Sequence, residues 1–343
     1  MAQRKGNYTI LFDDPPSVCA SSAIGGKKEA EGPLGNMFDM TSDDSYFGES
    51  SWEKAESRMQ KDAVNKALEK ANFSNAEIEC IFAGDLLNQC VGSSYGLRDL
   101  GIPLIGLYGA CSTMAESLTV ASVFLESGAV NKAIACTSSH FCSAERQFRY
   151  PLEYGGQRTP TAQWTATAAG AAVLEKGDTP PFVRAATVGT IEDLGIKDAN
   201  NMGAAMAPAA AMTLKRFFAD TQTNAENFDL IITGDLGKVG TKLLRELMQQ
   251  DGYHLEHAHT DCGLMLYNME KQDVHSGGSG CGCSASVMCG HIFPLMRKGQ
   301  LNDILFIATG ALMSPTVVQQ GESIASIAHL VYISSQKTGG RVS

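Results

Sequence analysis

The sequence contains an internal repeat, and this repeat constrains the fold more than any other feature. Residues 79–86 and 229–236 are apolar runs that close on Gly-Asp-Leu, 150 positions apart. Residues 109–138 and 280–309 share a second pattern, at a spacing of 171, in which a small-residue turn precedes a helix-like stretch, a polar break and an apolar strand. Apolar runs that end in Gly-Asp are typical of buried strands leading into turns. We therefore predict two copies of one unit, with 21 additional residues in the second copy.

Each copy alternates strands with helix-like stretches, which predicts an α/β fold with right-handed crossovers and mainly parallel sheets. Helices are expected at 52–71 and 204–220, before the two Gly-Asp-Leu runs, and the strand 165–174 closes the first copy. Polar, Gly and Pro residues at 175–181 mark the boundary, so we predict halves 1–178 and 179–343, related by a pseudo-twofold axis. The alternative is two unlike domains with a chance repeat.

Charge and composition exclude several classes of protein. The net charge of −10 argues against a nucleic-acid surface and against docking on an anionic membrane. No apolar run reaches the roughly 18 residues of a spanning helix, and the N-terminus does not resemble a secretory signal. Ten cysteines without an export signal indicate reduced thiols. We expect a soluble, intracellular protein.

Cys111 is the cysteine with the most reactive predicted setting. It follows the apolar run 104–110 and begins the predicted helix 112–127, whose start is marked by Ser112 and Thr113. The positive end of a helix dipole lowers the pKa of a thiol. A nucleophilic Cys111 is therefore weighed against a small thiol that only packs in a crowded turn.

The matching turn of the second copy is rich in glycine. Gly280, Cys281 and Gly282 lie in the run 277–284, Gly-Gly-Ser-Gly-Cys-Gly-Cys-Ser. Backbone N–H groups in such a run can surround an anion or an oxyanion, and small residues are equally typical of a helix that crosses close to a sheet. Under pseudo-twofold symmetry this turn and Cys111 face one central pocket.

The insertion of the second copy carries three histidines and a cysteine within nine residues: His254, His257, His259 and Cys262. Their spacing matches no common structural zinc pattern, so we predict no metal site. His259, near Asp261, is the candidate base for Cys111. The alternative for all three histidines is a solvated loop.

Polar and aromatic residues follow the second strand of the first copy. Ser138, Ser139 and His140 come where this strand ends, and parallel α/β sheets bind ligands at the carboxyl ends of their strands. Further on, Arg146 and Arg149 could each hold a carboxylate, and neighbouring aromatic rings could stack on a planar ligand. The alternative for the arginines is a domain or subunit contact.

The chain resembles the thiolase superfamily, which includes the condensing enzymes that make ketoacyl-thioesters. The duplicated unit, Gly-Ala-Cys-Ser-Thr at 109–113 and the glycine-rich turn at the matching place carry this resemblance. Several stretches resemble, more closely, the stage V sporulation protein AD family of spore-forming bacteria: 32–35 with Phe38-Asp39, 83–89, 144–157, 206–210, 277–284, and 308–312 with 314–316. The resemblance covers nearly the whole chain. It implies a thiolase-like fold with two tandem βαβαβ halves in αβαβα layers.

Two departures from the condensing enzymes bear on activity. Those enzymes carry His-x-x-Asn near the place where this chain has His-Thr-Asp-Cys at 259–262, and Gly-Asn or Gly-His-Pro near Gly280-Cys281-Gly282. Cys111 matches their nucleophile, but the second polar partner that stabilises the enolate or oxyanion is missing or replaced. Condensation and thiolysis are therefore not expected.

The resemblance implies non-enzymatic binding of dipicolinic acid, or of its calcium chelate, for uptake into the developing spore. The implied site is the pocket that corresponds to the enzymes' active site. Its expected residues are Cys111, Ser138, Ser139, His140, Arg146, Arg149, His259, Gly280, Cys281 and Gly282. No cofactor and no protein-bound metal are expected, because the ligand itself chelates calcium.

The resemblance also implies partners and a location. Other components of the spore uptake system would hold the protein peripherally at the spore inner membrane. A homodimer, usual in the superfamily, would involve residues 79–127. Two other functions stay open: an acyl-transferring enzyme with Cys111 as nucleophile and His259 as base, and a structural partner protein with a vestigial pocket.

Overall fold

The computed structural model describes residues 2–148, 157–339 and 341–342. In it, the two copies of the repeat form the two halves of one continuous sheet, with corresponding strand orders, and these halves are called here the first and the second sheet. The order in the first copy is β3 (Ser17–Gly26), β9 (Ala168–Glu175), β7 (Lys132–Ser139), β5 (Cys80–Gly84) and β6 (Leu104–Gly106). The order in the second copy is β10 (Phe182–Thr187), β15 (Ser326–Ser334), β14 (Asp303–Ala311), β11 (Leu230–Thr233) and β12 (His259–Asp261). The predicted duplication is confirmed.

Both sheets are mixed, so the prediction of mainly parallel sheets was wrong. In the first copy, β3 and β7 pair antiparallel with β9, and β5 pairs parallel with β7 and β6. The second copy repeats this pattern, and β10 meets β3 through the pair Phe182 and Ser17. Parallel neighbours need a crossover connection, usually a helix. In the first copy β5, β6 and β7 are linked in this way.

The outer faces of the two sheets are covered by matching helices. α2 (Trp52–Ala71) packs on β3, β9 and β7, and α6 (Met202–Thr221) packs on β14 and β15. Each of them ends at a residue in the left-handed conformation, Asn72 with φ 56° and Gln222 with φ 55°. The helices expected at 52–71 and 204–220 are confirmed, the second with slightly wider bounds.

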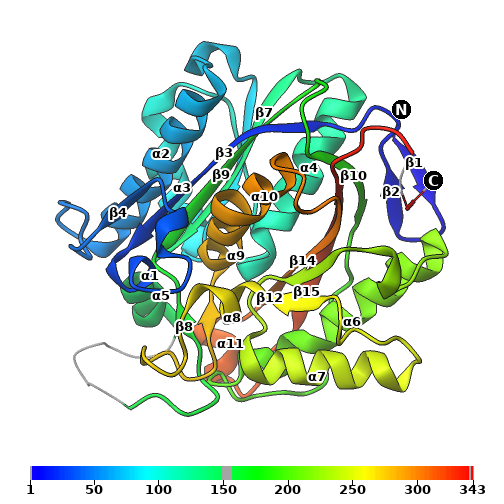
Figure 1. Cartoon of the computed structure of the whole chain (residues 1–343). Helices are drawn as coiled ribbons and strands as arrows, with labels where there is room; N and C mark the ends of the chain where they lie inside the picture. Colours follow the sequence, from blue (N-terminus) through cyan, green and yellow to red (C-terminus); the bar gives the residue numbers. More distant parts are fainter. Residues whose placement is uncertain (1, 149–156, 340, 343) are drawn as a thin grey trace.

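The middle layer consists of α4 (Thr113–Ser127) and α9 (Cys281–Val287). A short π-helix connects α9 to α10 (Phe293–Arg297). α4 contacts both sheets, and α9 contacts the first sheet and α4. Their buried side chains share one hydrophobic core with both sheets. α2 lies on one side of the molecule and α6 on the other, with α9 between them (Figure 1). The predicted thiolase-like layering is confirmed.

Shorter elements complete the fold. They are β1 (Gln3–Lys5), β2 (Thr9–Leu11), α1 (Lys27–Ala30), β4 (Met40–Ser42), α3 (Val91–Leu97), α5 (Phe141–Phe148), β8 (Trp164–Thr165), α7 (Gly237–Gln250), α8 (Cys262–Leu266), β13 (Gly278–Ser279) and α11 (Pro315–Gln319). β2 pairs with β10, so the start of the chain lies with the second sheet. The division at 178 and 179 stays a prediction.

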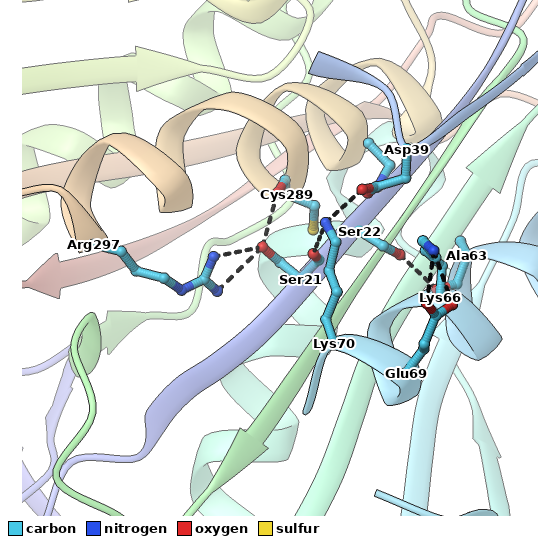
Figure 2. Close-up of polar contacts among 10 residues, drawn as sticks. Ser21, Ser22, Asp39, Ala63, Lys66, Glu69, Lys70, Cys289 and Arg297 are labelled. Atoms are coloured by element: carbon cyan, nitrogen blue, oxygen red, sulfur yellow. Dashed lines mark hydrogen bonds and ion pairs between the residues drawn. The ribbon is translucent and has the colours of Figure 1, made fainter. Parts of the chain in front are cut away.

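Polar contacts fasten α2 and α10 to β3 (Figure 2). The Ser21 hydroxyl donates to the Cys289 carbonyl at 2.8 Å and accepts from the Arg297 guanidinium at 3.1 Å. Lys70 on α2 donates to the Ser21 carbonyl at 2.9 Å and pairs with Asp39 at 2.6 Å. Ser21 therefore links the outer helix and the middle layer at one point of the first sheet. Among the described residues, no helix combines the length and the apolar character that a membrane span requires.

Candidate functional site

The turn that carries Cys111 and the glycine-rich turn of the second copy meet between the two sheets. Cys111 lies in a 3-10 turn, Ala110–Ser112, directly before α4, and Cys281 is the first residue of α9. Cys111 and Cys281 belong to one buried cluster with Leu86 and Ala144. The two helix starts therefore lie together, as the repeat predicts. All ten cysteines of the chain are free thiols.

A cavity of about 30 Å³ lies at this junction, which is room for about one or two water molecules. Its lining comes from both copies and is mainly apolar. The lining residues are Leu86, Tyr108, Ala110, Cys111, Ala144, Phe148, Thr165, Met202, Ser279, Ala311 and Met313. Of the expected site residues that the structure describes, Cys111 lines the cavity.

A buried carboxylate, Asp235, lies beside Cys111. It follows β11 and accepts hydrogen bonds from the Ser279 hydroxyl at 3.1 Å, the Gly280 N–H at 2.9 Å and the Thr309 hydroxyl at 2.8 Å. Burial raises the pKa of Asp235, and these hydrogen bonds oppose that rise. Asp235 is thus a polar centre that joins two segments of the second copy, the glycine-rich turn and β14.

The expectation of a lowered Cys111 pKa was wrong. The side chain is 6% exposed, and burial raises the pKa of the thiol well above its ordinary value. The charge of the neighbouring Asp235 raises this pKa further. Loss of water and a nearby negative charge both disfavour the thiolate, and together they outweigh the dipole of α4. Cys111 is therefore held as a thiol.

Two N–H groups of the glycine-rich turn already donate within the protein. The Gly280 N–H donates to Asp235, and the Gly282 N–H donates to the Ser139 hydroxyl at 3.2 Å. A Cβ atom on Gly282 would lie 2.1 Å from the carbonyl oxygen of Ala168 on β9, so the helix needs glycine to approach this strand. Of the two hypotheses for this turn, close helix–sheet packing is confirmed. The anion that the turn binds is Asp235.

Ser138 and Ser139 lie next to this turn, but their polar groups have internal partners. Ser138 donates to the buried Glu56 at 3.2 Å, and its carbonyl accepts from the Cys281 thiol at 2.9 Å. Ser139 donates to the Ala166 carbonyl at 2.7 Å. These serines therefore fix the ends of β7 and α9 against each other.

His140 and Arg146 have partners away from this cavity. The His140 ring contacts the Ser45 carbonyl through Nε2 at 2.7 Å, and burial lowers its pKa. Arg146 forms an ion pair with Glu53. Neither side chain lines the cavity beside Cys111. Arg149 lies outside the described residues.

The structure places His259 away from the cavity lining, at the edge strand β12. Its ring contacts the Thr233 hydroxyl at 3.1 Å and accepts from Arg245 at 3.3 Å. Burial, together with the Arg245 charge, lowers the His259 pKa to about 3. The group that lies next to Cys111 is Asp235 rather than this imidazole. His254 and His257 are exposed, as a solvated loop predicts.

The sequence relatives agree with this architecture. Residues 6–334 match the model of the stage V sporulation protein AD family. The chain belongs to this family. It is 47% identical over 335 residues to stage V sporulation protein AD of Bacillus subtilis (strain 168), and the match covers 98% of each chain.

Solved structures of condensing enzymes share the fold. The 3-oxoacyl-[acyl-carrier-protein] synthase III from Aquifex aeolicus VF5 is similar with a TM-score of 0.55 and 13% identity, over 92% of this chain and 98% of the synthase. Cerulenin-bound OleA from Xanthomonas campestris is similar with a TM-score of 0.57 and 15% identity, over 94% and 97%. At this identity the likeness shows the fold alone, which is thiolase-like.

Asp235 is the site residue that sequence reasoning missed in this family member. Its signal was present, because Asp235 belongs to the Gly-Asp-Leu run that revealed the repeat. The carboxyl end of a strand is also where α/β sheets place functional groups, the rule that selected Ser138 and Ser139. Among the described residues, no group of three or more His, Cys, Asp or Glu side chains could hold a metal ion.

Proposed function

We propose that this family member is a non-enzymatic binding protein that uses the cavity beside Cys111. The observation that carries the proposal is the contact between Cys111 and the buried Asp235. An acyl-transferring cysteine needs a thiolate and free donors for the oxyanion. Here the carboxylate favours the protonated thiol and takes the Gly280 N–H, so both requirements are opposed by one residue.

The proposed ligand is dipicolinic acid or its calcium chelate. The motivation is the close resemblance of several stretches to a sporulation family, together with aromatic side chains at the cavity, Tyr108 and Phe148, that suit a planar ring. A ring with two carboxylates is larger than a cavity of about 30 Å³. Binding therefore requires the lining to move apart, and it needs no covalent step at Cys111.

Calorimetric titration with dipicolinate, with and without calcium, tests the ligand. We expect saturable binding to the full chain, and loss of that binding in Ala311→Leu, because a larger side chain at this lining position fills the cavity. Cys289→Ala, which removes a buried thiol outside the lining, is the control and is expected to bind as the wild type does. No binding to the wild type, or equal affinity in Ala311→Leu, would overturn the proposed site.

Mass spectrometry of the intact protein after incubation with acyl-coenzyme A tests the absence of catalysis. We expect no acyl adduct on Cys111 for short or long acyl chains. An adduct that disappears in Cys111→Ala would establish the acyl-transferring alternative instead.

The partners and the location are further parts of this proposal. We propose that other components of the spore uptake system hold the protein at the spore inner membrane. We also propose a homodimer formed through residues 79–127, and the exposed edge-strand residues Leu104 and Ile105 support it. Fractionation of sporulating cells tests the first point and sedimentation of the purified chain tests the second.

A further inference from the structure

A thin wall separates the cavity beside Cys111 from a larger outer hollow of about 400 Å³. The wall is made of residues 86–90 and of α5, and consecutive residues face opposite sides of it. Leu86 and Ala144 line the inner cavity, whereas Leu87 and Ser143 line the outer hollow. Only one layer of chain therefore lies between the two spaces.

One side chain joins the two parts of this wall. Gln147 on α5 donates from Nε2 to the Leu86 carbonyl at 3.1 Å and accepts from the Asn88 N–H at 3.1 Å. The ion pair between Arg146 and Glu53 adds a contact on the outer side, where both residues line the hollow. Exposed ion pairs contribute little. The two hydrogen bonds of Gln147 are thus the main polar link across the wall.

The same wall contains unfavourable backbone conformations. Gln89 has a φ of 56° and the following residue, Cys90, a φ of 49°. The left-handed region is unfavourable for residues other than glycine. Two such residues in succession are held there only by their surroundings. The wall therefore holds strained backbone at two consecutive residues.

We propose that this wall is the entrance to the cavity beside Cys111 and that Gln147 is its latch. When the Gln147 hydrogen bonds break, residues 86–90 move away from α5 and the inner cavity joins the outer hollow. The joined space has the size of known small-molecule sites, roughly 300–1,000 Å³. This inference rests on the proposed function only in assigning a ligand to the cavity. The entrance itself is testable without that ligand.

Chemical labelling of Cys111 in the full chain tests the entrance. N-phenylmaleimide, a ring-sized reagent, and methyl methanethiosulfonate, a small one, are compared at pH 8.5, with peptide-level mass spectrometry to follow each cysteine. Gln147→Ala is expected to raise the N-phenylmaleimide rate at Cys111 about tenfold, because two hydrogen bonds of the closed state are lost. The rate for the small reagent is expected to rise less. A lower pKa of the Cys111 thiol would instead raise the rates for both reagents equally.

Gln272→Ala is the matched control. Gln272 also joins two segments by two hydrogen bonds, from Nε2 to the Lys28 carbonyl at 2.7 Å and from the Asn268 N–H to Oε1 at 2.9 Å, but it does not line either space. It is expected to leave the Cys111 rates unchanged. The fully buried Cys283 reports general unfolding and is expected to stay unlabelled in both variants.

Native-state hydrogen exchange of the wild type supplies a readout without a variant. The Asn88 amide should exchange through a local opening, well before global unfolding. An unchanged Cys111 rate in Gln147→Ala, an equal rise in Gln272→Ala, or Asn88 exchange only through global unfolding would overturn the entrance. Faster labelling in a protein that binds no dipicolinate would leave the entrance standing and refute the proposed function alone.

Discussion

The two Gly-Asp turns of the repeat have the same sequence and different partners. Asp85, after β5, accepts from the Leu87 N–H at 2.9 Å and from the Ser93 N–H and hydroxyl, both at 2.7 Å. These donors lie in the turn that follows Asp85 and in α3, the next helix of the same copy. Asp235, after β11, instead binds Ser279 and Gly280, directly before α9, and Thr309 on β14, and it lies beside Cys111 of the other copy.

An aspartate at the end of β12, the counterpart of β6, explains this difference. Asp261 on β12 accepts from the Leu236 N–H at 2.8 Å and the Gly237 N–H at 3.0 Å, so it holds the turn that follows Asp235. In the first copy Asp85 performs this task itself. Because Asp261 accepts from the N–H groups of this turn, Asp235 can accept hydrogen bonds from other segments where the two copies meet. Two equivalent aspartates of the repeat therefore have different partners because of one residue on the neighbouring strand.

The largest expected effect compares the glycines of the two turns. A Cβ atom at Gly84 would lie 2.0 Å from the Leu107 carbonyl, whereas one at Gly234 would lie 3.2 Å or more from its neighbours. Gly84→Ala should lower the free energy of unfolding by about 3 kcal/mol, and Gly234→Ala by less than about 1 kcal/mol. Urea denaturation followed by circular dichroism measures both. Equal losses would show that the two turns are packed alike.

A smaller expected effect on the free energy of unfolding distinguishes the two central helices, α4 and α9. Burial raises the pKa of Glu116 on α4 to about 7, whereas the repeat-related position on α9 is Val287. A carboxyl whose pKa is raised in the folded state stabilises it below the unfolded pKa, and this stability is lost as the pH rises through 7. Glu116→Gln should therefore raise the free energy of unfolding at pH 8 by about 2 kcal/mol and change it little at pH 4. The same change at both pH values would contradict the assignment.

The next prediction compares the two aspartates directly. Asp235→Asn removes the charge beside Cys111, so the thiol pKa should fall and alkylation by iodoacetamide at pH 8.5 should become about tenfold faster. Asp85→Asn should leave Cys111 alkylation unchanged and lower the free energy of unfolding by about 1–2 kcal/mol, because its donors lose a charged acceptor. A pH–rate profile of Cys111 alkylation in each variant distinguishes the two roles. If Asp85→Asn accelerated the reaction as much, the contrast between the turns would fail.

The smallest expected effect concerns His259. His259→Asn should leave the rate and the pH profile of Cys111 alkylation within about twofold of the wild type, since the imidazole contacts Thr233 and Arg245. A higher pH midpoint or a large loss of rate would restore His259 as the base of a catalytic pair.

Local pattern was enough to predict most of the architecture. Apolar runs and polar breaks located the strands before both Gly-Asp turns and the helices that cover them, because burial and turn formation act on neighbouring residues. The strand directions were harder to predict from the sequence. β3 and β9 carry no local mark of their antiparallel pairing, which depends on how the chain returns to the sheet after long connections.

The candidate site, too, could be predicted from the sequence only in part. Cys111 and the glycine-rich turn were recognisable from residue type and position, and the repeat predicted that they meet. Cys111 and Asp235 are 124 positions apart in the chain. Whether an aspartate or a histidine lies next to the thiol depends on how two sheets pack across α4 and α9, and a thiol's pKa depends on that distant neighbour and on burial. The sequence by itself therefore determined two copies of a layered unit with a cysteine at their junction. Only the tertiary structure decided that a carboxylate holds this cysteine protonated.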